Sequence, residues 1–438
     1  MARTTALMVS GKILLPFLLI TSLFALWGFA NDITNPMVSA FKKILELNNF
    51  QASLVQLAFY GGYFTMAIPA AIFVNWFSYK KGILLGLALY ACGALLFYPA
   101  AAFQEYNYFL AALYILTFGL AFLETTANPY ILSMGAEETA TQRLNLAQAF
   151  NPLGALGGLI VAQNFILNAL KTDDLDEEGN LIYSTLPEEA RENIRTSDLE
   201  VIRDPYIFLG LVVVLFFVVI LLVKMPKNEN KESNVPIIKS IKRLFKHPKF
   251  YGGVVAQAFY VGAQIMCWTY IYQYAESIGI PNSTAVNYAI SALVLFLIGR
   301  WIGTALLRYI NAGKLLMVFA IGAMICTILT ICITGPSGLY ALVAISFFMS
   351  IMFPTIYGIA LEGRGEDAKF GAAFLVMAIV GGALMPSLQG LLLDIGGPGY
   401  VDTTILGVPE VNFSFILPAI CFLVVGLYGR NVYKKRIN

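Results

Sequence analysis

The chain has 438 residues, of which 58% are hydrophobic and only 12% are charged. Soluble domains carry about a quarter charged residues, so this composition excludes an ordinary soluble protein and indicates a polytopic membrane protein. The formal net charge of +2 is too small to indicate a nucleic-acid partner.

Twelve apolar stretches follow one another along the chain, and each is about as long as a tilted membrane-spanning helix. The first is longer than the core of a signal peptide and contains polar residues, so we interpret it as a retained span. The sequence therefore predicts an all-α membrane protein with twelve transmembrane helices. The stretches are 14–38, 51–77, 82–103, 108–134, 143–167, 206–225, 250–276, 284–310, 314–334, 337–361, 370–394 and 411–429.

Basic residues predict the orientation of these helices. Lysines and arginines are frequent between residues 224 and 249 and after residue 429. By the positive-inside rule both segments are cytoplasmic, and an even number of helices then places both termini in the cytoplasm. Within the first segment, residues 237–250 alternate apolar and basic side chains, as an amphipathic helix at the membrane surface does. The acidic segment 168–204 is interpreted as an external loop, in which short helical turns are an alternative.

The chain divides into two similar halves. Residues 1–225 and residues 250–438 each hold six of the apolar stretches, and the basic linker 226–249 joins them. Two such halves are typical of transporters, in which the substrate binds between them. A channel is the competing architecture, but no re-entrant pore loop is evident.

A carboxylate lies deep in the fourth stretch. Insertion scales put the cost of a charge at that depth at roughly 2.5 to 3.5 kcal/mol, so Glu124 calls for a function. Asn128 follows one helical turn later, and Pro129 removes a backbone hydrogen bond. The alternative is that Glu124 is permanently paired with a buried cation, either Arg143 or Arg300. We favour a proton-carrying role.

The first stretch contains a second carboxylate. Asp32 and Asn35 are one turn apart, which places them on one helix face. A polar helix end near the outer interface is the alternative. We favour a cavity in which Asp32 takes part in proton coupling and Asn35 binds substrate.

Amide side chains recur at every third residue of the fifth stretch, where Asn145, Gln148 and Asn151 are expected on one helix face. The seventh stretch adds Gln264 and Trp268. Sugar hydroxyl groups need amide partners, and the apolar face of a sugar ring stacks on an aromatic side chain. These five residues are therefore predicted to bind substrate, although tryptophan also anchors helices at membrane interfaces.

Enzyme motifs are absent from the sequence. It has no GxSxG, Walker or HExxH pattern and only one histidine, so we predict neither an enzyme nor a cofactor. Its five cysteines lie inside apolar stretches without metal-ligand spacing, and no metal site is expected.

Several distinctive motifs are spread over the chain. They are Phe24-Ala25-Leu26-Trp27, Ala58-Phe59-Tyr60-Gly61-Gly62-Tyr63-Phe64, Leu123-Glu124-Thr125-Thr126-Ala127-Asn128-Pro129, the segment 143–151, Tyr260-Val261-Gly262-Ala263-Gln264 and Ile379-Val380-Gly381-Gly382. By these motifs the chain resembles the L-fucose/proton symporter family of the major facilitator superfamily, and the likeness covers nearly the whole chain. The resemblance implies the fold of that superfamily. It also implies that Glu124 is the family's proton-carrying glutamate and that Gln148 and Asn151 contact the sugar.

One position departs from the family pattern. The family carries an aspartate important for transport in its first helix, and an ungapped count from Trp27 places Asn35 there. Either Asp32 takes over this role, or Glu124 couples the proton alone.

The predicted function is the import of L-fucose or a related monosaccharide together with a proton. A glucose/galactose transporter of the same family is the main alternative. A drug/proton antiporter and a sugar sensor that does not transport are further alternatives. The expected setting is a bacterial inner membrane, where the protein contacts lipid and works as a monomer.

Overall fold

The computed structural model describes residues 11–34, 37–47, 49–173, 182–226, 236–280, 282–393 and 403–434. Within these residues, twelve helical segments are long and apolar enough to cross a membrane, which confirms the predicted number of spans and the all-α class. These segments are Leu14–Thr34, Leu57–Trp76, Tyr79–Phe103, Tyr106–Ser133, Glu137–Ala169, Glu188–Leu222, Pro248–Ser277, Thr284–Leu306, Ala312–Cys332, Pro336–Leu361, Gly365–Leu393 and Glu410–Lys434.

Half of the twelve spans consist of one long helix, and the other half are broken into shorter helices. The helices up to residue 222 are α1 (Leu14–Thr34), α2 (Met37–Ile44), α3 (Asn49–Trp76), α4 (Tyr79–Leu95), α5 (Phe97–Phe103), α6 (Tyr106–Ser133), α7 (Ala140–Gln148), α8 (Asn151–Val161) and α9 (Glu188–Leu222), with α2 between the first two spans. Short turns surround α7 and α8: η2 (Glu137–Thr139), η3 (Ala162–Ile166), η4 (Leu167–Ala169), η5 (Lys171–Asp173) and η6 (Ile182–Thr185).

The remaining helices begin with the linker helix. They are α10 (Ile237–Phe245), α11 (Pro248–Thr269), α12 (Ile271–Ser277), α13 (Asn282–Leu306), α14 (Ala312–Cys332), α15 (Pro336–Met349), α16 (Met352–Leu361), α17 (Ala368–Met377), α18 (Gly381–Leu393), α19 (Glu410–Ser414) and α20 (Ile416–Lys434), with the turns η7 (Gly365–Asp367) and η8 (Ala378–Val380). A hairpin of β1 (Thr404–Ile405) and β2 (Val408–Pro409) precedes α19, with Thr404 opposite Pro409.

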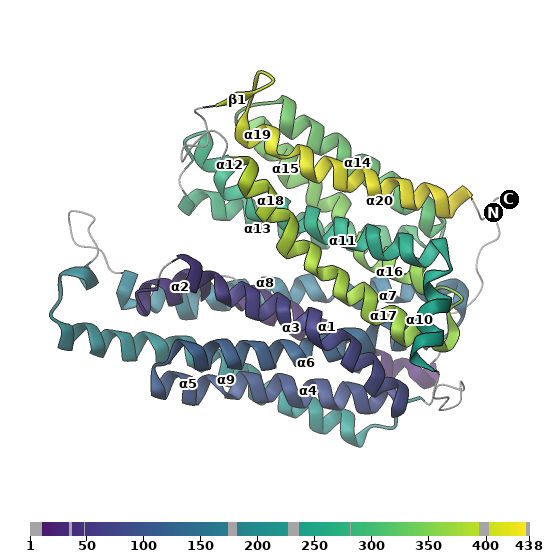
Figure 1. Cartoon of the computed structure of the whole chain (residues 1–438), viewed down its shortest axis with the longest axis horizontal. Helices are drawn as coiled ribbons and strands as arrows, with labels where there is room; N and C mark the ends of the chain where they lie inside the picture. Colours follow the sequence, from purple (N-terminus) through teal and green to yellow (C-terminus); the bar gives the residue numbers. More distant parts are fainter. Residues whose placement is uncertain are drawn as a thin grey trace.

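The spans pack in two groups. Figure 1 shows the first six, purple to teal, below the last six, green to yellow. The groups meet where α7 packs against α13 and α16, and where α3 packs against α17. We call the end of the bundle at which α20 ends and α10 lies the termini side (Figure 1).

Hydrogen bonds join the two groups on the termini side. The Gln142 side chain donates to the Thr304 carbonyl oxygen at 3.2 Å, and the Gly363 amide donates to the Glu137 carboxylate at 3.0 Å. All four bonded residues lie at or just beyond the ends of spans that face the termini side. The two groups are thus held together at this end of the bundle.

The sixth span corrects one sequence-based interpretation. Residues 188–204, expected in an external loop, form the first half of α9, a helix of 35 residues. Glu188 and Glu189 occupy its first turn, where the helix dipole favours negative charge. Ion pairs three residues apart, such as Arg203 with Glu200 at 3.1 Å, support the exposed part. Polar composition suggested a loop, although opposite charges three residues apart are the spacing expected on a helix.

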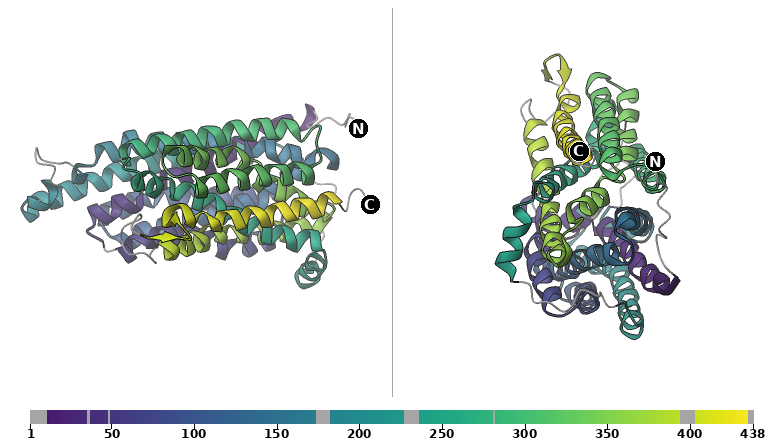
Figure 2. Two further views of the ribbon diagram at one scale, coloured as in Figure 1. Left: turned by 90° about the horizontal axis from the view of Figure 1, so that it is seen from above. Right: turned by 90° about the vertical axis from the view of Figure 1, so that its right-hand side faces the viewer.

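The predicted amphipathic linker segment is confirmed as α10, with α11 starting at Pro248. Ser240 and Leu244 are buried on one of its faces. The Ser240 hydroxyl donates to Asp367 at 2.7 Å, and Arg243 donates to both carboxylate oxygens of Asp367 at 2.9 and 2.6 Å. These bonds attach α10 to the start of α17, and Figure 2 shows it lying across the end of the bundle.

Glycines allow α1 and α8 to pack closely. A Cβ atom at Gly154 would lie 1.8 Å from the Ala25 carbonyl oxygen, and one at Gly28 would lie 2.0 Å from the Asn151 carbonyl oxygen. Only glycine permits such a backbone approach. This contact places Asn151 directly against the helix that carries Asp32.

Gly154→Ala is expected to destabilise the fold by about 1 to 3 kcal/mol, because the methyl group forces α1 and α8 apart. Thermal unfolding in detergent measures the effect. Gly157→Ala is the matched control on the same helix, since its Cβ atom would meet only the Phe29 ring at 3.7 Å. Equal unfolding temperatures for the two variants would contradict this account of the helix contact.

Candidate functional site

Glu124 lies within α6, more than two turns before that helix ends at Ser133. Pro129 is part of the same helix, and the Asn128 side chain donates to the Glu124 carbonyl oxygen at 3.0 Å. The Glu124 Oε2 atom is buried and has no hydrogen-bond partner within the described part of the chain. The carboxyl group is therefore available to exchange a proton or to bind water or substrate.

Neither candidate arginine pairs with Glu124. Arg143 donates to the carbonyl oxygens of Ile131 at 2.9 Å and Leu132 at 2.6 Å, so it caps the last turn of α6. Arg300 donates to the carbonyl oxygens of Ser350 at 2.6 Å and Gln148 at 2.8 Å. Backbone carbonyl groups satisfy both cations, so the fixed ion pair weighed from the sequence does not form among the described residues.

Two tyrosines lie within electrostatic range of Glu124. Tyr63 belongs to the neighbouring helix α3, whereas Tyr357 belongs to α16 of the other group of spans. The hydroxyl group of Tyr357 is buried and interacts with the Asn128 side chain, the residue one turn after Glu124 on α6. Glu124 therefore faces both groups of spans.

The three amides of the fifth span contact three different helices. A break separates α7, which ends at Gln148, from α8, which begins at Asn151. The Asn145 side chain donates to Thr355 Oγ1 at 3.2 Å, that of Gln148 to Asn128 Oδ1 at 2.9 Å, and that of Asn151 to the Phe24 carbonyl oxygen at 3.2 Å.

The three amides therefore do not share one helix face, as the sequence predicted, but point in successively different directions around the helix axis. A spacing of three residues falls about 60° short of a full turn at each step. Consequently Asn145 faces the other group of spans, Gln148 faces the helix of Glu124, and Asn151 faces α1.

Gln264 and Trp268 lie one turn apart on α11, and both side chains are partly exposed. The Trp268 indole donates to Ser346 Oγ at 3.2 Å. Its ring meets the Phe296 ring edge to face, with 5.1 Å between ring centres. The indole is therefore held in a fixed orientation by α13 and α15.

Asp32 lies two residues before the end of α1 and is partly exposed. It is within electrostatic range of Tyr60 on α3. Tyr60 also approaches Gly382, where a Cβ atom would lie 3.8 Å from its ring. Asn35, the other residue expected here, lies outside the described residues.

Comparison with known proteins identifies the family. The model of the Major Facilitator Superfamily matches residues 18–369. This chain belongs to the Major Facilitator Superfamily. It is 56% identical over 430 residues to the L-fucose-proton symporter of Haemophilus influenzae, covering 98% of this chain and 99% of the relative. It is also 32% identical to the glucose/galactose transporter of Brucella abortus (strain 9-941), covering 94% and 92%.

A solved structure also matches this member of the Major Facilitator Superfamily. It is the crystal structure of a transporter of the same superfamily, FucP, in the outward conformation. The TM-score is 0.85 at 34% identity, and the match covers 96% of this chain and 99% of that one. The relatives named here are transporters, which agrees with the sequence-based prediction that the chain is not an enzyme.

Some residues of this Major Facilitator Superfamily site were missed from the sequence. Tyr60 and Tyr63 lie in one of the motifs that carry the resemblance, but were assigned no role. Arg300 was considered only as a partner of Glu124, whereas it links α13 to the backbone of Gln148 across the two groups. No sequence signal indicated Tyr357, because its proximity to Glu124 depends on how the groups dock.

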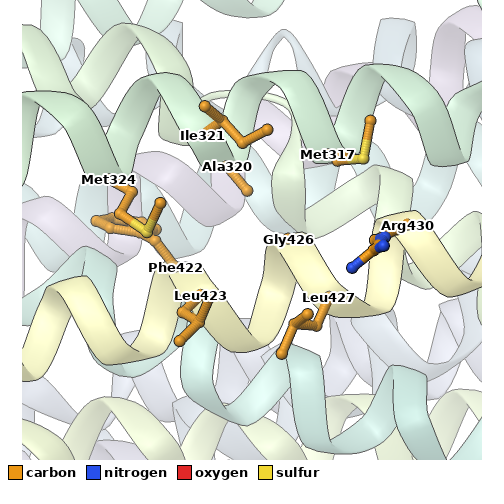
Figure 3. Close-up of a pocket in the computed structure, with 9 residues that line it drawn as sticks. All are labelled: Met317, Ala320, Ile321, Met324, Phe422, Leu423, Gly426, Leu427 and Arg430. Atoms are coloured by element: carbon orange, nitrogen blue, oxygen red, sulfur yellow. The ribbon is translucent and has the colours of Figure 1, made fainter.

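A separate cavity of about 130 Å³ lies between α14 and α20 (Figure 3). Figure 3 shows apolar side chains around it and the Arg430 side chain at one end. Ile321, Leu423 and Leu427 of its lining are exposed on the outside of the bundle. None of the predicted site residues lines this cavity, so it is distinct from the candidate site.

Proposed function

We propose that this protein is a sugar/proton symporter that imports L-fucose or a related monosaccharide by alternating access. The observation that carries the proposal is Glu124, a carboxyl group inside the membrane with an unpartnered oxygen and an amide network beside it. The L-fucose-proton symporter of Haemophilus influenzae, which matches nearly end to end, supports the choice of substrate and coupling ion.

The basic residues of the linker and tail support an orientation with both termini in the cytoplasm of a bacterial cell, and hence an inner-membrane location. The termini side is then cytoplasmic. The hydrogen bonds that join the groups there close the path to the cytoplasm, and the match to an outward conformation supports the same state. The protein is proposed to work as a monomer surrounded by lipid.

The transport cycle follows from this state. Residues 1–225 and residues 250–438 move as two halves joined by the linker 226–249. From outside, Glu124 takes up a proton and the sugar enters between the halves. The halves then rock, because a neutral carboxyl group crosses an occluded, weakly solvated state at a lower free-energy cost than a carboxylate. Loss of the proton on the inside resets the carrier.

Sugar recognition is assigned to the amides and one aromatic ring. The side-chain NH₂ group of Gln148 donates a hydrogen bond to Asn128 Oδ1. The side-chain carbonyl oxygen of Gln148 can then accept a hydrogen bond from a sugar hydroxyl group. Asn151, Asn145 and Gln264 supply further hydrogen bonds, and Asn35 belongs to the same predicted set. The fixed indole of Trp268 offers a face for the sugar ring. Asp32 is assigned to proton coupling together with Glu124.

The test is uptake of labelled monosaccharides into proteoliposomes under an imposed pH gradient and then under a sodium gradient. We expect L-fucose to accumulate only with the pH gradient. Accumulation driven by sodium would contradict the proton assignment, and the absence of any sugar uptake by folded protein would contradict the function.

A glucose or galactose transporter is the second candidate, supported by the 32% identity to the Brucella abortus protein. Competition separates the two. If the protein transports L-fucose, unlabelled L-fucose should suppress uptake of the labelled sugar at a lower concentration than D-glucose or D-galactose does. The opposite order would favour the second candidate.

Gln148→Ala is expected to weaken sugar binding by about 1 to 3 kcal/mol, because it removes one polar partner and leaves Asn128 unsatisfied. Equilibrium binding to purified protein measures the effect. Gln389→Ala is the control, since Gln389 is a buried amide that donates to Ser414 on α19. Equal affinity in both variants would show that Gln148 serves packing only.

A further inference from the structure

Two backbone carbonyl groups at breaks in the spans lack their ordinary helical donor. In an α-helix the carbonyl oxygen of each residue accepts a hydrogen bond from the N–H group four residues later. Pro152 at the start of α8 has no N–H group to give to the carbonyl oxygen of Gln148, where α7 ends. Pro354 in α16 likewise has none for the carbonyl oxygen of Ser350, which follows the end of α15. Both oxygens therefore need a donor from elsewhere in the bundle.

One side chain donates to both of these oxygens. Arg300 on α13 donates from Nε to the Ser350 carbonyl oxygen at 2.6 Å and from Nη1 to the Gln148 carbonyl oxygen at 2.8 Å. Its guanidinium lies 4.6 Å from the centre of the Phe296 ring, and the residue is 3% exposed. A guanidinium has five N–H donors in a rigid planar arrangement, so it can serve two oxygens on different helices. Membrane helices tolerate prolines where a neighbouring helix satisfies the freed oxygen, and α13 is that neighbour.

Glycines hold α13 against the break between α15 and α16. A Cβ atom at Gly299 would lie 2.3 Å from the Phe347 carbonyl oxygen, and one at Gly303 would lie 2.3 Å from the Ile351 side chain. Glycines spaced four residues apart allow membrane helices to approach closely. Because these three helices all belong to the second half, the bond from Arg300 to Ser350 lies within one half. The other bond of Arg300, to the Gln148 carbonyl oxygen, crosses between the halves.

The bond from Arg300 to Gln148 lies deeper in the bundle than the neighbouring bond that closes the termini side. That neighbouring bond joins the Gln142 side chain to the Thr304 carbonyl oxygen. Thr304 lies four residues after Arg300 on α13, and Gln142 lies six residues before Gln148 on α7. At 1.5 Å per residue, the Arg300 bond is about 6 to 9 Å further from the termini side. It is thus the one of these two bonds that reaches the level of the sugar-binding amides.

We propose that Arg300 is a positioning residue for the sugar site. It holds the turn from Gln148 to Asn151 in its binding geometry while the halves are docked on the termini side, and it releases the turn when they separate. This inference rests on the proposed symport function. Arg300 acts through the backbone of Gln148 and needs no contact with the sugar. The sugar should therefore bind more tightly from outside than from the cytoplasm.

Separation of the halves removes the donor of the Gln148 carbonyl oxygen. Arg300 stays bonded to Ser350 in the second half, while Gln148 moves away with the first half. Pro152 still lacks an N–H group, so this oxygen has no helical donor in the separated state. Without its hydrogen bond the turn is no longer held in one shape, and the side chains of Gln148 and Asn151 lose their fixed spacing. Weaker binding on the cytoplasmic side then favours release of the imported sugar.

The test measures the half-saturating sugar concentration for counterflow at each face of proteoliposomes in which the protein has one orientation. In the parent, the external value should be about tenfold lower than the internal value, within the range for one buried carbonyl group that loses its donor. Arg300→Met, which removes every donor, should raise the external value by about tenfold and leave the internal value within about twofold, because the bond is already broken in the inward state. Arg300→Lys keeps the charge but not the planar set of donors, and should also raise only the external value.

Pro152→Ala restores the missing helical donor and gives an independent test. The added N–H group can bond to the Gln148 carbonyl oxygen in both states, so in the parent background the internal half-saturating concentration should fall toward the external value. Combined with Arg300→Met, this substitution should return the external value close to that of the parent. Pro354→Ala combined with Arg300→Met is the matched control. It supplies a donor to the Ser350 carbonyl oxygen only, and should restore nothing.

Equal half-saturating concentrations at the two faces of the parent would overturn the inference. An equal loss at both faces in Arg300→Met, which a purely structural role predicts, would do the same, and so would Pro152→Ala without effect in either background. Unfolding temperatures in detergent verify that the variants are folded. Pro152→Ala in the parent background needs no change at Arg300, so it decides the question if the Arg300 variants do not fold. Absence of sugar counterflow in the parent would instead contradict the proposed function.

Discussion

Glu124→Gln is expected to abolish proton-driven accumulation of sugar while leaving sugar exchange intact. Glutamine resembles the protonated carboxyl group in shape and charge, so the halves still rock with sugar bound. It cannot release a proton, so the gradient no longer drives net uptake. Accumulation under an imposed pH gradient and counterflow of labelled sugar, both in proteoliposomes, measure the two activities.

The matched control for this experiment is Glu362→Gln. Glu362 is also a carboxylate close to the termini side, but it is partly exposed and forms an ion pair with Lys249. An exposed pair of this kind contributes little, so the variant should accumulate sugar like the parent. Normal accumulation in Glu124→Gln would remove Glu124 from the coupling mechanism.

The cost of placing a charge at this depth makes the expected effect large. A carboxylate inside a span costs roughly 2.5 to 3.5 kcal/mol even with access to water, and the cost rises when the site closes. Protonation removes most of this penalty. Since neither Arg143 nor Arg300 neutralises Glu124, protonation is the remaining way to lower the barrier to rocking.

Much of the fold could be predicted from the sequence, because spans are set by length and hydrophobicity. All twelve spans were found in this way. The break between Gln148 and Asn151 was not predicted, although Pro152 stands at the start of α8, because prolines are tolerated inside membrane-spanning helices and do not by themselves indicate a break. The helical residues 188–204 were also missed, because an exposed helix supported by ion pairs has the composition of a loop.

Part of the candidate site could also be predicted from the hydrophobicity pattern of the sequence. A carboxylate or an amide inside an apolar stretch is visible in the sequence, and Glu124 and Gln148 were found by that signal. Partners that come from the other half are not visible in this way. The bond from Arg300 to the Gln148 carbonyl oxygen and the position of Tyr357 depend on how two helix groups dock.

The amide contacts also suggest how the proposed outward state would hold the proposed sugar site. Asn145 bonds across the halves, and Gln148 is held both through its side chain and through its carbonyl oxygen. Rocking must break the bonds that cross the halves. A sugar that offers hydroxyl groups to these amides can replace the lost bonds, which links substrate binding to the change of state.

The departure in the first helix leads to the second large expected effect. Asp32→Asn should reduce active uptake to below about a tenth of the parent rate, if Asp32 supplies the second carboxylate of the proton path. Its position near Tyr60, which reaches Gly382 of the other half, supports such a role. Proton-driven uptake in proteoliposomes measures the loss, and sugar binding verifies that the protein is folded.

A pair of double variants decides whether the carboxylate must lie on one helix face. Asp32→Asn with Asn35→Asp moves the carboxylate three residues along, to the position that the family pattern favours, and should restore part of the uptake. Asp32→Asn with Asn31→Asp moves it by one residue, about 100° around the helix, and should restore none. Full uptake in Asp32→Asn alone would make this residue a solvated helix end. Glu124 would then couple proton and sugar without a second carboxylate.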